Sequence, residues 1–194
     1  LVPGDYDGDG KSDLAAYEKT TGKWYIKTLA GATIAWGESW GSPSFTPVWG
    51  DYDGDGSSDL ALFDVNASSW YIYSLNNGVL AWATSWGWAG AVPVSGDYDG
   101  DGMSDLAFFD KSLNAYWYIS STDGGAVIAR GVSWGNASMT PVPGDYDGDR
   151  NFDLAVNNPA DSNWYIKTLN GTILKWAEAW GAVGMVAVPG DYDG

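Results

Sequence analysis

Short apolar and aromatic runs, separated by glycine, asparagine, aspartate or serine, recur along the whole chain. Three such runs follow one another in the same order four times. The first starts at an aspartate and reads DLAAY, DLALF, DLAFF and DLAVN; the second reads KWYIKTL, SWYIYSL, YWYISST and NWYIKTL; the third reads IAWGESWG, LAWATSWG, IARGVSWG and LKWAEAWG. Runs of this length, rich in aromatic and β-branched residues and bounded by turn residues, predict β-strands. No stretch combines helical periodicity with capping signals.

An acidic phrase precedes each set of three runs and sets the period of the chain. It reads GDYDGDGKSD at 4–13, GDYDGDGSSD at 50–59, GDYDGDGMSD at 96–105 and GDYDGDRNFD at 144–153, and it begins again as GDYDG at 190–194. The leading aspartates are 46, 46, 48 and 46 residues apart, and a fixed period of this size indicates a repeat architecture. A further short segment before each phrase (LVPG, TPVWG, VPVSG, TPVPG and VAVPG) predicts one more strand per repeat.

Four short strands in a repeat of about 46 residues are typical of the blades of a β-propeller. We therefore predict an all-β fold of β-propeller blades, with four antiparallel strands in each of four repeats. The repeats form a single repeat domain over 1–194 and span approximately 4–49, 50–95, 96–143 and 144–189, followed by the start of a fifth at 190–194. The DLALF run is apolar on both faces, as expected of a blade that lies between two neighbours.

The partial fifth repeat leads to an expectation about the parent protein. The simplest interpretation is that the chain is a segment of a longer periodic array, which either closes as a larger propeller or stacks head to tail into a filament. A four-bladed ring with one redundant terminal strand is the alternative.

The charge of the chain is concentrated in the acidic phrases. The formal net charge is −16, and 18 of the 25 acidic residues lie in these phrases, which indicates local cation sites rather than an acidic tail. An anionic surface of this kind argues against nucleic acid as a partner. The absence of Cys and His excludes disulfides, thiolate or imidazole metal ligands and histidine-based catalytic triads. We expect neither a signal peptide nor a membrane span in this segment.

Aspartate occupies positions 1, 3, 5 and 9 of each phrase, counted from its leading aspartate, and glycine occupies position 4 and, in three copies, position 6. Alternate carboxylates on a tight loop can converge on one hard cation such as Ca²⁺, which prefers oxygen ligands. Glycine at position 6 permits the positive φ that wraps the chain around the ion, and the backbone carbonyl of position 7 would add a ligand. The residues at position 7 are Lys11, Ser57, Met103 and Asn151. The competing interpretation is that the aspartates only form turns, but the same spacing of four carboxylates in four copies favours the cation.

The loop is not an EF-hand, because position 12 is apolar where that loop requires a bidentate Glu, and because strands flank it. It resembles the D-x-D-x-D-G-x-x-D-hydrophobic loop of FG-GAP repeats, also called VCBS repeats, which form the calcium-binding β-propellers of integrin α subunits. The resemblance covers all four copies and implies about four Ca²⁺ ions, one per repeat. The implied ligand sets are Asp5, Asp7, Asp9 and Asp13; Asp51, Asp53, Asp55 and Asp59; Asp97, Asp99, Asp101 and Asp105; and Asp145, Asp147, Asp149 and Asp153.

Two of the phrases depart from this pattern. Arg150 replaces glycine at position 6 of the fourth, where a positive φ costs a non-glycine residue about 1 kcal/mol or more and where a cation is added beside the site. We expect the fourth site to be the weakest. The fifth phrase supplies only Asp191 and Asp193, so on its own it is not a complete site.

Tryptophan is the other recurrent feature, and its 13 copies fall largely into three aligned sets. They are Trp24, Trp70, Trp117 and Trp164; Trp40, Trp86, Trp134 and Trp180; and Trp36, Trp82 and Trp176, with Arg130 in the third copy. Positions repeated in every blade favour a structural role, in which a bulky ring with one polar N–H locks the blades together. Exposed rings would instead form platforms for sugars. The unrepeated Trp49 and Trp88, with Arg130, are the better candidates for a specific surface.

Three functional hypotheses follow. The leading one is a non-enzymatic extracellular module, structural or adhesive, in which Ca²⁺ rigidifies the scaffold and the partner is a further copy or another extracellular protein. The alternative is a lectin-like propeller that binds glycans through its tryptophans. A catalytic domain has little support, since the acids outside the loops form no obvious unrepeated pair of the kind a glycosidase needs. Extracellular or cell-surface localisation follows from the calcium available there and agrees with glycosylation sequons at Asn66, Asn136 and Asn170.

Overall fold

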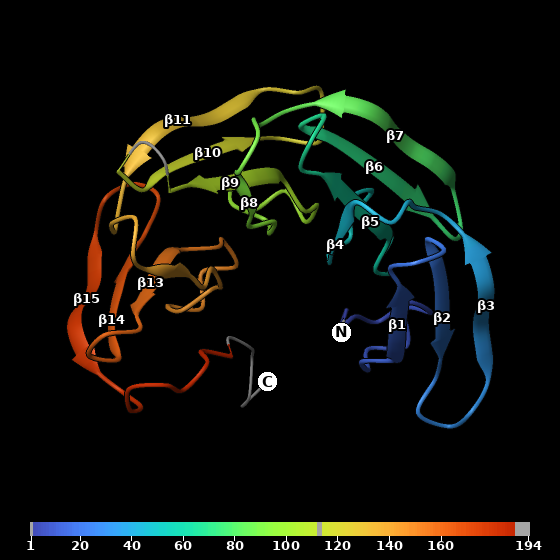
Figure 1. Cartoon of the computed structure of the whole chain (residues 1–194), viewed down its shortest axis with the longest axis horizontal. Helices are drawn as coiled ribbons and strands as arrows, with labels where there is room; N and C mark the ends of the chain where they lie inside the picture. Colours follow the sequence, from blue (N-terminus) through green and yellow to red (C-terminus); the bar gives the residue numbers. More distant parts are fainter. Residues whose placement is uncertain (1, 112–113, 189–194) are drawn as a thin grey trace. The chain divides into compact units, whose positions relative to one another are not determined.

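The computed structural model describes residues 2–111 and 114–188, which consist of strands, turns and loops. Contacts divide the chain into two units, Leu1–Ala91 and Val92–Gly194, and each unit holds two antiparallel sheets (Figure 1). Within each sheet the strands follow one another in chain order, as in the blade of a propeller. The predicted all-β class and its propeller blades are confirmed.

The first unit contains sheets β1-β2-β3 and β4-β5-β6-β7. Their strands are β1 (Leu14–Glu18), β2 (Lys23–Lys27), β3 (Thr33–Ser39), β4 (Phe45–Val48), β5 (Leu60–Asp64), β6 (Ser69–Ser74) and β7 (Gly78–Ser85).

The second unit contains sheets β8-β9-β10-β11 and β12-β13-β14-β15. Their strands are β8 (Val92–Pro93), β9 (Leu106–Asp110), β10 (Tyr116–Ser120), β11 (Val127–Ser133), β12 (Thr140–Pro141), β13 (Leu154–Asn158), β14 (Asn163–Lys167) and β15 (Ile173–Ala179).

The sheets reproduce the strand pattern expected from the sequence. The three longer strands occur four times, and the short strand before an acidic loop occurs as β4, β8 and β12. Residues 2–4 form no strand, so the first sheet has three. Of the segment VAVPG, residues 186–188 form no strand and the rest lies outside the described residues, as do Asp191 and Asp193. Each acidic loop of a four-stranded sheet therefore connects its first two strands.

In the second, third and fourth sheets, the strand after the acidic loop is the most buried part of the sheet. Four of the five residues of β5 and β13 are buried, as are all five of β9, whereas β1 is half-exposed. Leu60 and Leu62 of β5 pack with Trp24 in the core of the first unit. In the second unit, Leu154 of β13 packs with Trp117. Burial on both faces explains why these strands read as continuous apolar runs.

The tryptophan of the second run fastens the strands of each sheet together. It is completely buried in the first three repeats, at Trp24, Trp70 and Trp117. In all four repeats its indole Nε1 donates a hydrogen bond of 2.7 to 3.0 Å to the main-chain carbonyl of the tryptophan that ends the third run. The donor and acceptor pairs are Trp24 and Trp40, Trp70 and Trp86, Trp117 and Trp134, and Trp164 and Trp180. The structural role expected for this set is confirmed.

Two register shifts recur between the second and third long strands of every sheet, and the first is a β-bulge with the same backbone conformation in all four. In the first sheet Trp24 pairs with Glu38 and Tyr25 pairs with Trp36, so that one residue of β3, Gly37, is left over. The corresponding residues are Gly37, Ala83, Gly131 and Ala177, and all four have a positive φ of 54° to 76°. The bulge redirects the side chains on either side of it.

Among the described residues, no helix has the length and apolar character needed to cross a membrane.

Two tryptophans of the first sheet provide a matched test of this packing. Trp24 is fully buried, whereas the side chain of Trp36 is 80% exposed. We expect Trp24→Ala to lower the free energy of unfolding by about 3–5 kcal/mol, because it removes a buried ring and its hydrogen bond, and Trp36→Ala to lower it by less than about 1 kcal/mol. Urea denaturation monitored by circular dichroism measures both, and equal effects would contradict the assigned packing.

Candidate metal centres in the acidic loops

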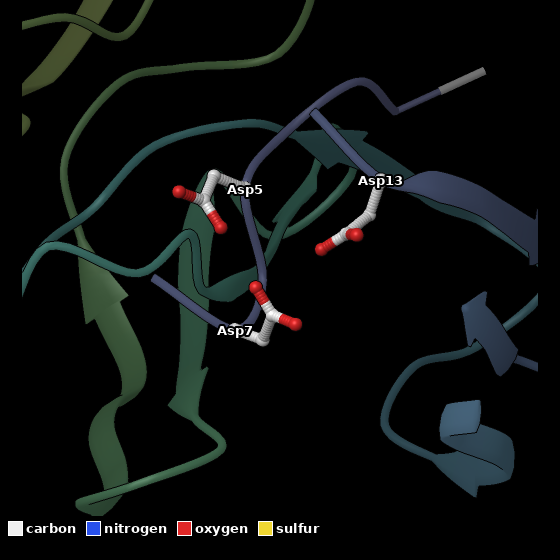
Figure 2. A group of neighbouring side chains, drawn as sticks. All are labelled: Asp5, Asp7 and Asp13. Carbon is white, nitrogen blue, oxygen red and sulfur yellow. The ribbon is translucent and has the colours of Figure 1, made fainter. Parts of the chain in front are cut away.

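Each of the four acidic loops gathers three carboxylates. One oxygen from each lies within 4.8 Å of the other two, a spacing that matches ligands around a single hard cation. In three loops the group comes from positions 1, 3 and 9, and Figure 2 shows the first of these, with Asp5, Asp7 and Asp13 turned toward a common point. In the third loop it comes from positions 1, 3 and 5. The groups are Asp5, Asp7 and Asp13; Asp51, Asp53 and Asp59; Asp97, Asp99 and Asp101; and Asp145, Asp147 and Asp153.

The aspartate at position 1 shapes the loop around itself. In the second loop the amides of Gly54 and Gly56 donate to the two oxygens of Asp51 over 2.7 and 2.8 Å. The amides of positions 4 and 6 make the same pair of bonds in the other three loops. The aspartates are therefore turn formers as well as candidate ligands, because each carboxylate oxygen keeps a further lone pair.

The aspartate at position 9 closes the loop. Its amide donates to the carbonyl of the glycine that precedes the loop, over 2.7 to 2.8 Å in all four copies. Its Oδ2 accepts a bond of 2.7 to 2.9 Å from the amide of the tyrosine at position 2. These bonds bring the two ends of the loop together, so that position 9 faces positions 1 and 3.

Position 6 adopts the positive φ that the sequence predicted. The residues at position 6, Gly10, Gly56, Gly102 and Arg150, have φ values of 82°, 87°, 88° and 73°. Arg150 is thus held in the left-handed region, which disfavours a side chain with a Cβ. The fourth loop keeps the geometry of the others at the cost of this strain.

The electrostatics of position 9 fit a bound cation. Asp59, Asp105 and Asp153 are buried, and burial, aided by the neighbouring carboxylates, raises the pKa of these groups to about 7, 7 and 6. Within the described residues, Oδ1 of Asp105 is buried without a hydrogen-bond partner. A cation in the loop would supply the missing partner and offset the repulsion among the carboxylates.

Position 5 lies outside the three-carboxylate group in three of the four loops, and its role as a ligand there stays a prediction. Asp101 belongs to the carboxylate group of its loop, whereas Asp9, Asp55 and Asp149 do not belong to theirs. Asp9 forms an ion pair of 2.8 Å with the ammonium of Lys11, which lowers the pKa of Asp9.

In the second loop, side chains from the turn between β6 and β7 contact the acidic residues. Nδ2 of Asn76 donates to Asp55 over 2.8 Å, and Nδ2 of Asn77 donates to Asp53 over 2.8 Å.

At position 7 of the four loops, the main-chain amide donates to the carboxylate at position 5. The residues are Lys11, Ser57, Met103 and Asn151. The role of their carbonyls as ligands stays a prediction.

The tyrosine at position 2 is a structural residue of the loop that was not expected from the sequence. Tyr6, Tyr52 and Tyr98 are buried, and the hydroxyl of Tyr98 donates to the carbonyl of Val94 over 2.6 Å. The same bond, to the carbonyl four residues earlier, is made by Tyr6 and Tyr146. The signal was available, because tyrosine follows the leading aspartate in every copy of the phrase. It anchors the loop in the core, and its amide holds position 9.

Arg150 provides a test of the loop conformation. We expect Arg150→Gly to stabilise the protein in chelator by up to about 1 kcal/mol, since glycine adopts this φ without the steric penalty. The reverse change in the third loop, Gly102→Arg, should destabilise it by about 1 kcal/mol or more. Urea unfolding in chelator measures both, and a loss of stability in Arg150→Gly would contradict the strain assigned to this residue.

Comparisons with known proteins place these loops in a family. A model of the FG-GAP-like repeat matches residues 5–62 and 97–156, which is more than half of the chain. The comparison with curated proteins gave no match. Among solved structures, a lectin from Agrocybe aegerita that recognises non-reducing terminal N-acetylglucosamine superposes with a TM-score of 0.58 at 16% sequence identity, over 88% of this chain and 48% of the lectin. The chain thus spans about half of that structure, and the likeness shows the fold alone. The repeated acidic loops, the meander sheets and the extent of the family match lead to one conclusion: the chain belongs to the FG-GAP-like repeat family.

Proposed function

We propose that the protein is a non-enzymatic extracellular scaffold, structural or adhesive, whose repeats are stabilised by about four Ca²⁺ ions. The observation that carries this proposal is that every one of the four loops brings three carboxylates together, from positions 1, 3 and 9 in three loops and from positions 1, 3 and 5 in the third. All side-chain donors are carboxylate oxygens, which suit a hard cation. The ion would be held by positions 1, 3 and 9 in the first, second and fourth loops, and by positions 1, 3 and 5 in the third.

The role of the ion would be to neutralise charge rather than to perform chemistry. At Asp59, Asp105 and Asp153, position 9 is buried, lies near other carboxylates and immediately precedes the most buried strand of its sheet. Without a cation, this charge opposes folding of the loop; with one, the loop is fixed at both of its ends. An extracellular location supports this role, because millimolar calcium there fills loops of modest affinity. The sequon asparagines Asn66, Asn136 and Asn170 are exposed, as glycosylation would require.

The apolar surface of the fourth repeat supports a role in contact with other proteins. Trp180, Met185 and Val186 are between 65% and 84% exposed, and they line an open hollow of about 450 Å³. Exposed apolar patches of this kind mark interaction sites. The partner would be another copy of the chain or a different extracellular protein.

Removal of calcium tests the proposal. We expect the protein to bind about four Ca²⁺ ions, counted by native mass spectrometry, and its melting temperature to fall when excess EGTA is added, because the buried carboxylates lose their counter-charge. The apparent affinity should also fall as the pH drops below about 7, since protons then compete for Asp59 and Asp105. Light scattering on the same samples reports any calcium-dependent self-association.

Controls separate calcium from a general effect of salt. Magnesium at equal ionic strength should raise the melting temperature much less. The fourth site should be the weakest of the four, and Arg150→Gly should strengthen it. A protein that binds no Ca²⁺ at millimolar concentration, or that melts at the same temperature with and without EGTA, would overturn the scaffold as proposed.

Glycan binding is the second candidate, and one set of exposed tryptophans favours it. Trp36, Trp82 and Trp176 are 80%, 69% and 68% exposed. Each ring meets a tyrosine of the adjacent strand edge-on, with centroids 5.3 to 5.4 Å apart and interplanar angles of 85° to 89°. A ring that is exposed yet held in place is suited to stacking on a sugar. The structurally similar lectin recognises N-acetylglucosamine, which names the first sugar to try.

Fluorescence titration with N-acetylglucosamine and its oligomers tests this candidate. We expect quenching that is reduced by Trp82→Ala and Trp176→Ala, because the platforms are removed. Trp49→Ala removes an unrepeated ring, 40% exposed, and tests whether the surface expected from the sequence binds the sugar instead. The absence of any quenching across a panel of glycans would exclude the lectin and leave the scaffold proposal standing.

A further inference from the structure

Acidic loops of neighbouring repeats are joined by a main-chain hydrogen bond. The amide of Ser58, in the second loop, donates to the carbonyl of Asp5, in the first, over 2.5 Å. In the second unit, the amide of Phe152 donates in the same way to the carbonyl of Asp97 over 2.6 Å. Both bonds run from position 8 of one loop to position 1 of the preceding loop. The same bond therefore occurs once in each unit.

Each of these bonds connects two candidate cation sites directly. Asp5 contributes a carboxylate to the first group, and Ser58 immediately precedes Asp59 of the second. Likewise, Asp97 belongs to the third group, and Phe152 immediately precedes Asp153 of the fourth. A displacement of the ligand residue in one loop thus acts on the residue next to a buried ligand in the other.

The loops of a pair also pack closely enough to require glycine. A Cβ on Gly4 would lie 2.6 Å from Oγ of Ser58, and a Cβ on Gly96 would overlap the ring of Phe152. At the equivalent residue of the fourth repeat, Gly144, the nearest atom would be 3.4 Å away and belongs to Tyr146 of the same loop. The glycine before an acidic loop therefore lies close to another loop only where the two loops are joined by this hydrogen bond.

In the second unit the two loops also share an open hollow of about 330 Å³. It is lined by Asp99 of the third loop and by Asp149 and Asp153 of the fourth. The ring of Phe152 meets that of Tyr98, the loop anchor of the third repeat, at 5.9 Å. Carboxylates of both loops therefore line the same hollow, and beside it the two loops are packed together by the contact between Phe152 and Tyr98.

We propose that the cation sites fill in coupled pairs, the first with the second and the third with the fourth. This inference rests on the cation binding proposed above. An ion in one loop fixes position 1 and so presents its carbonyl to the amide of the neighbouring loop. The buried aspartate that follows this amide is then already in place for the second ion, whose binding has less ordering cost to overcome. Neutralising one loop also lowers the repulsion felt by the other.

The test uses the full chain with chosen sites disabled. Asp→Asn at position 3 removes one ligand charge from an exposed or half-exposed side chain and leaves the bonds of positions 1 and 9 intact. D7N/D53N keeps the third and fourth sites, and D7N/D53N/D147N keeps the third alone. By calorimetric titration with CaCl₂, we expect the third site to bind at least about fivefold more weakly when the fourth is disabled, the lower end of typical coupling.

Two controls distinguish coupling from a loss of total charge. D53N/D147N also removes two carboxylates but leaves the first and third sites, whose loops are not successive, so their ions should bind independently. In the D7N/D53N background, Gly96→Ala should abolish the coupling by pushing the loops apart, whereas Gly144→Ala should preserve it. Circular dichroism establishes that each variant is folded, and Gly96→Ala in the otherwise unchanged protein gives a second test that removes no ligand.

The outcomes separate this inference from the function on which it rests. Stepwise binding in which the second ion of a pair binds more tightly, with the effect lost in Gly96→Ala, supports paired loading. Four independent sites, unaffected by the loss of a neighbour, overturn the coupling but leave the calcium scaffold intact. A failure of the unmutated protein to bind Ca²⁺ overturns both.

Discussion

The structure depends on a negative charge placed at the edge of the core in each repeat. The aspartate at position 9 accepts a hydrogen bond from the amide of the loop tyrosine and closes the loop through its own amide; in the second, third and fourth repeats it immediately precedes the most deeply buried strand of its sheet. Its carboxylate therefore cannot leave for solvent without breaking the loop from the core. Burial raises the pKa of Asp59 and Asp105 to about 7 because the charged carboxylate is disfavoured there, and the cation proposed above would offset this cost.

Much of the fold was predictable because its signals are local. Turn residues bound every strand, and the acidic phrase marks the period. The exposure of the tryptophans was not predictable in this way. Trp24 and Trp36 lie in adjacent strands of similar composition, yet one is buried and the other is 80% exposed. The bulge at Gly37, which is an alanine in two of the repeats, shifts the register by one residue and so sets the face that Trp36 occupies, before a second shift between Ile26 and Lys27 changes the register again.

The candidate site also has a part that local sequence signals predict and a part that they do not. The grouping of positions 1, 3 and 9, seen in three of the loops, was predictable because its geometry follows from hydrogen bonds within the loop. Position 5 was not, because Lys11 pairs with Asp9 in one repeat and Asn76 bonds to Asp55 in another. These partners differ between copies and, in the case of Asn76, come from a distant turn. The hydrogen bond between successive loops could not be predicted either, since the bond from Phe152 to Asp97 joins main-chain atoms of segments more than 50 residues apart.

In the sheets that carry an exposed tryptophan of this set, the acidic loop and the tryptophan lie toward opposite edges of the sheet. This arrangement determines how the two proposed functions can be related. An acidic loop leads into the inner strands such as β5, whereas Trp82 lies on β7, at the far edge of the same sheet (Figure 1). A cation could influence a ligand on Trp82 only through the strands between them. Trp82 is held by contacts with Tyr71 and Trp40, and Trp40 belongs to the preceding repeat. The first and second repeats are thus linked twice: by the contact between Trp40 and Trp82 at the exposed tryptophan, and by the hydrogen bond from Ser58 to Asp5 between the acidic loops. Cations that fix the link between the acidic loops would order the aromatic platform without touching it, so that a scaffold role and a binding role are compatible in one chain.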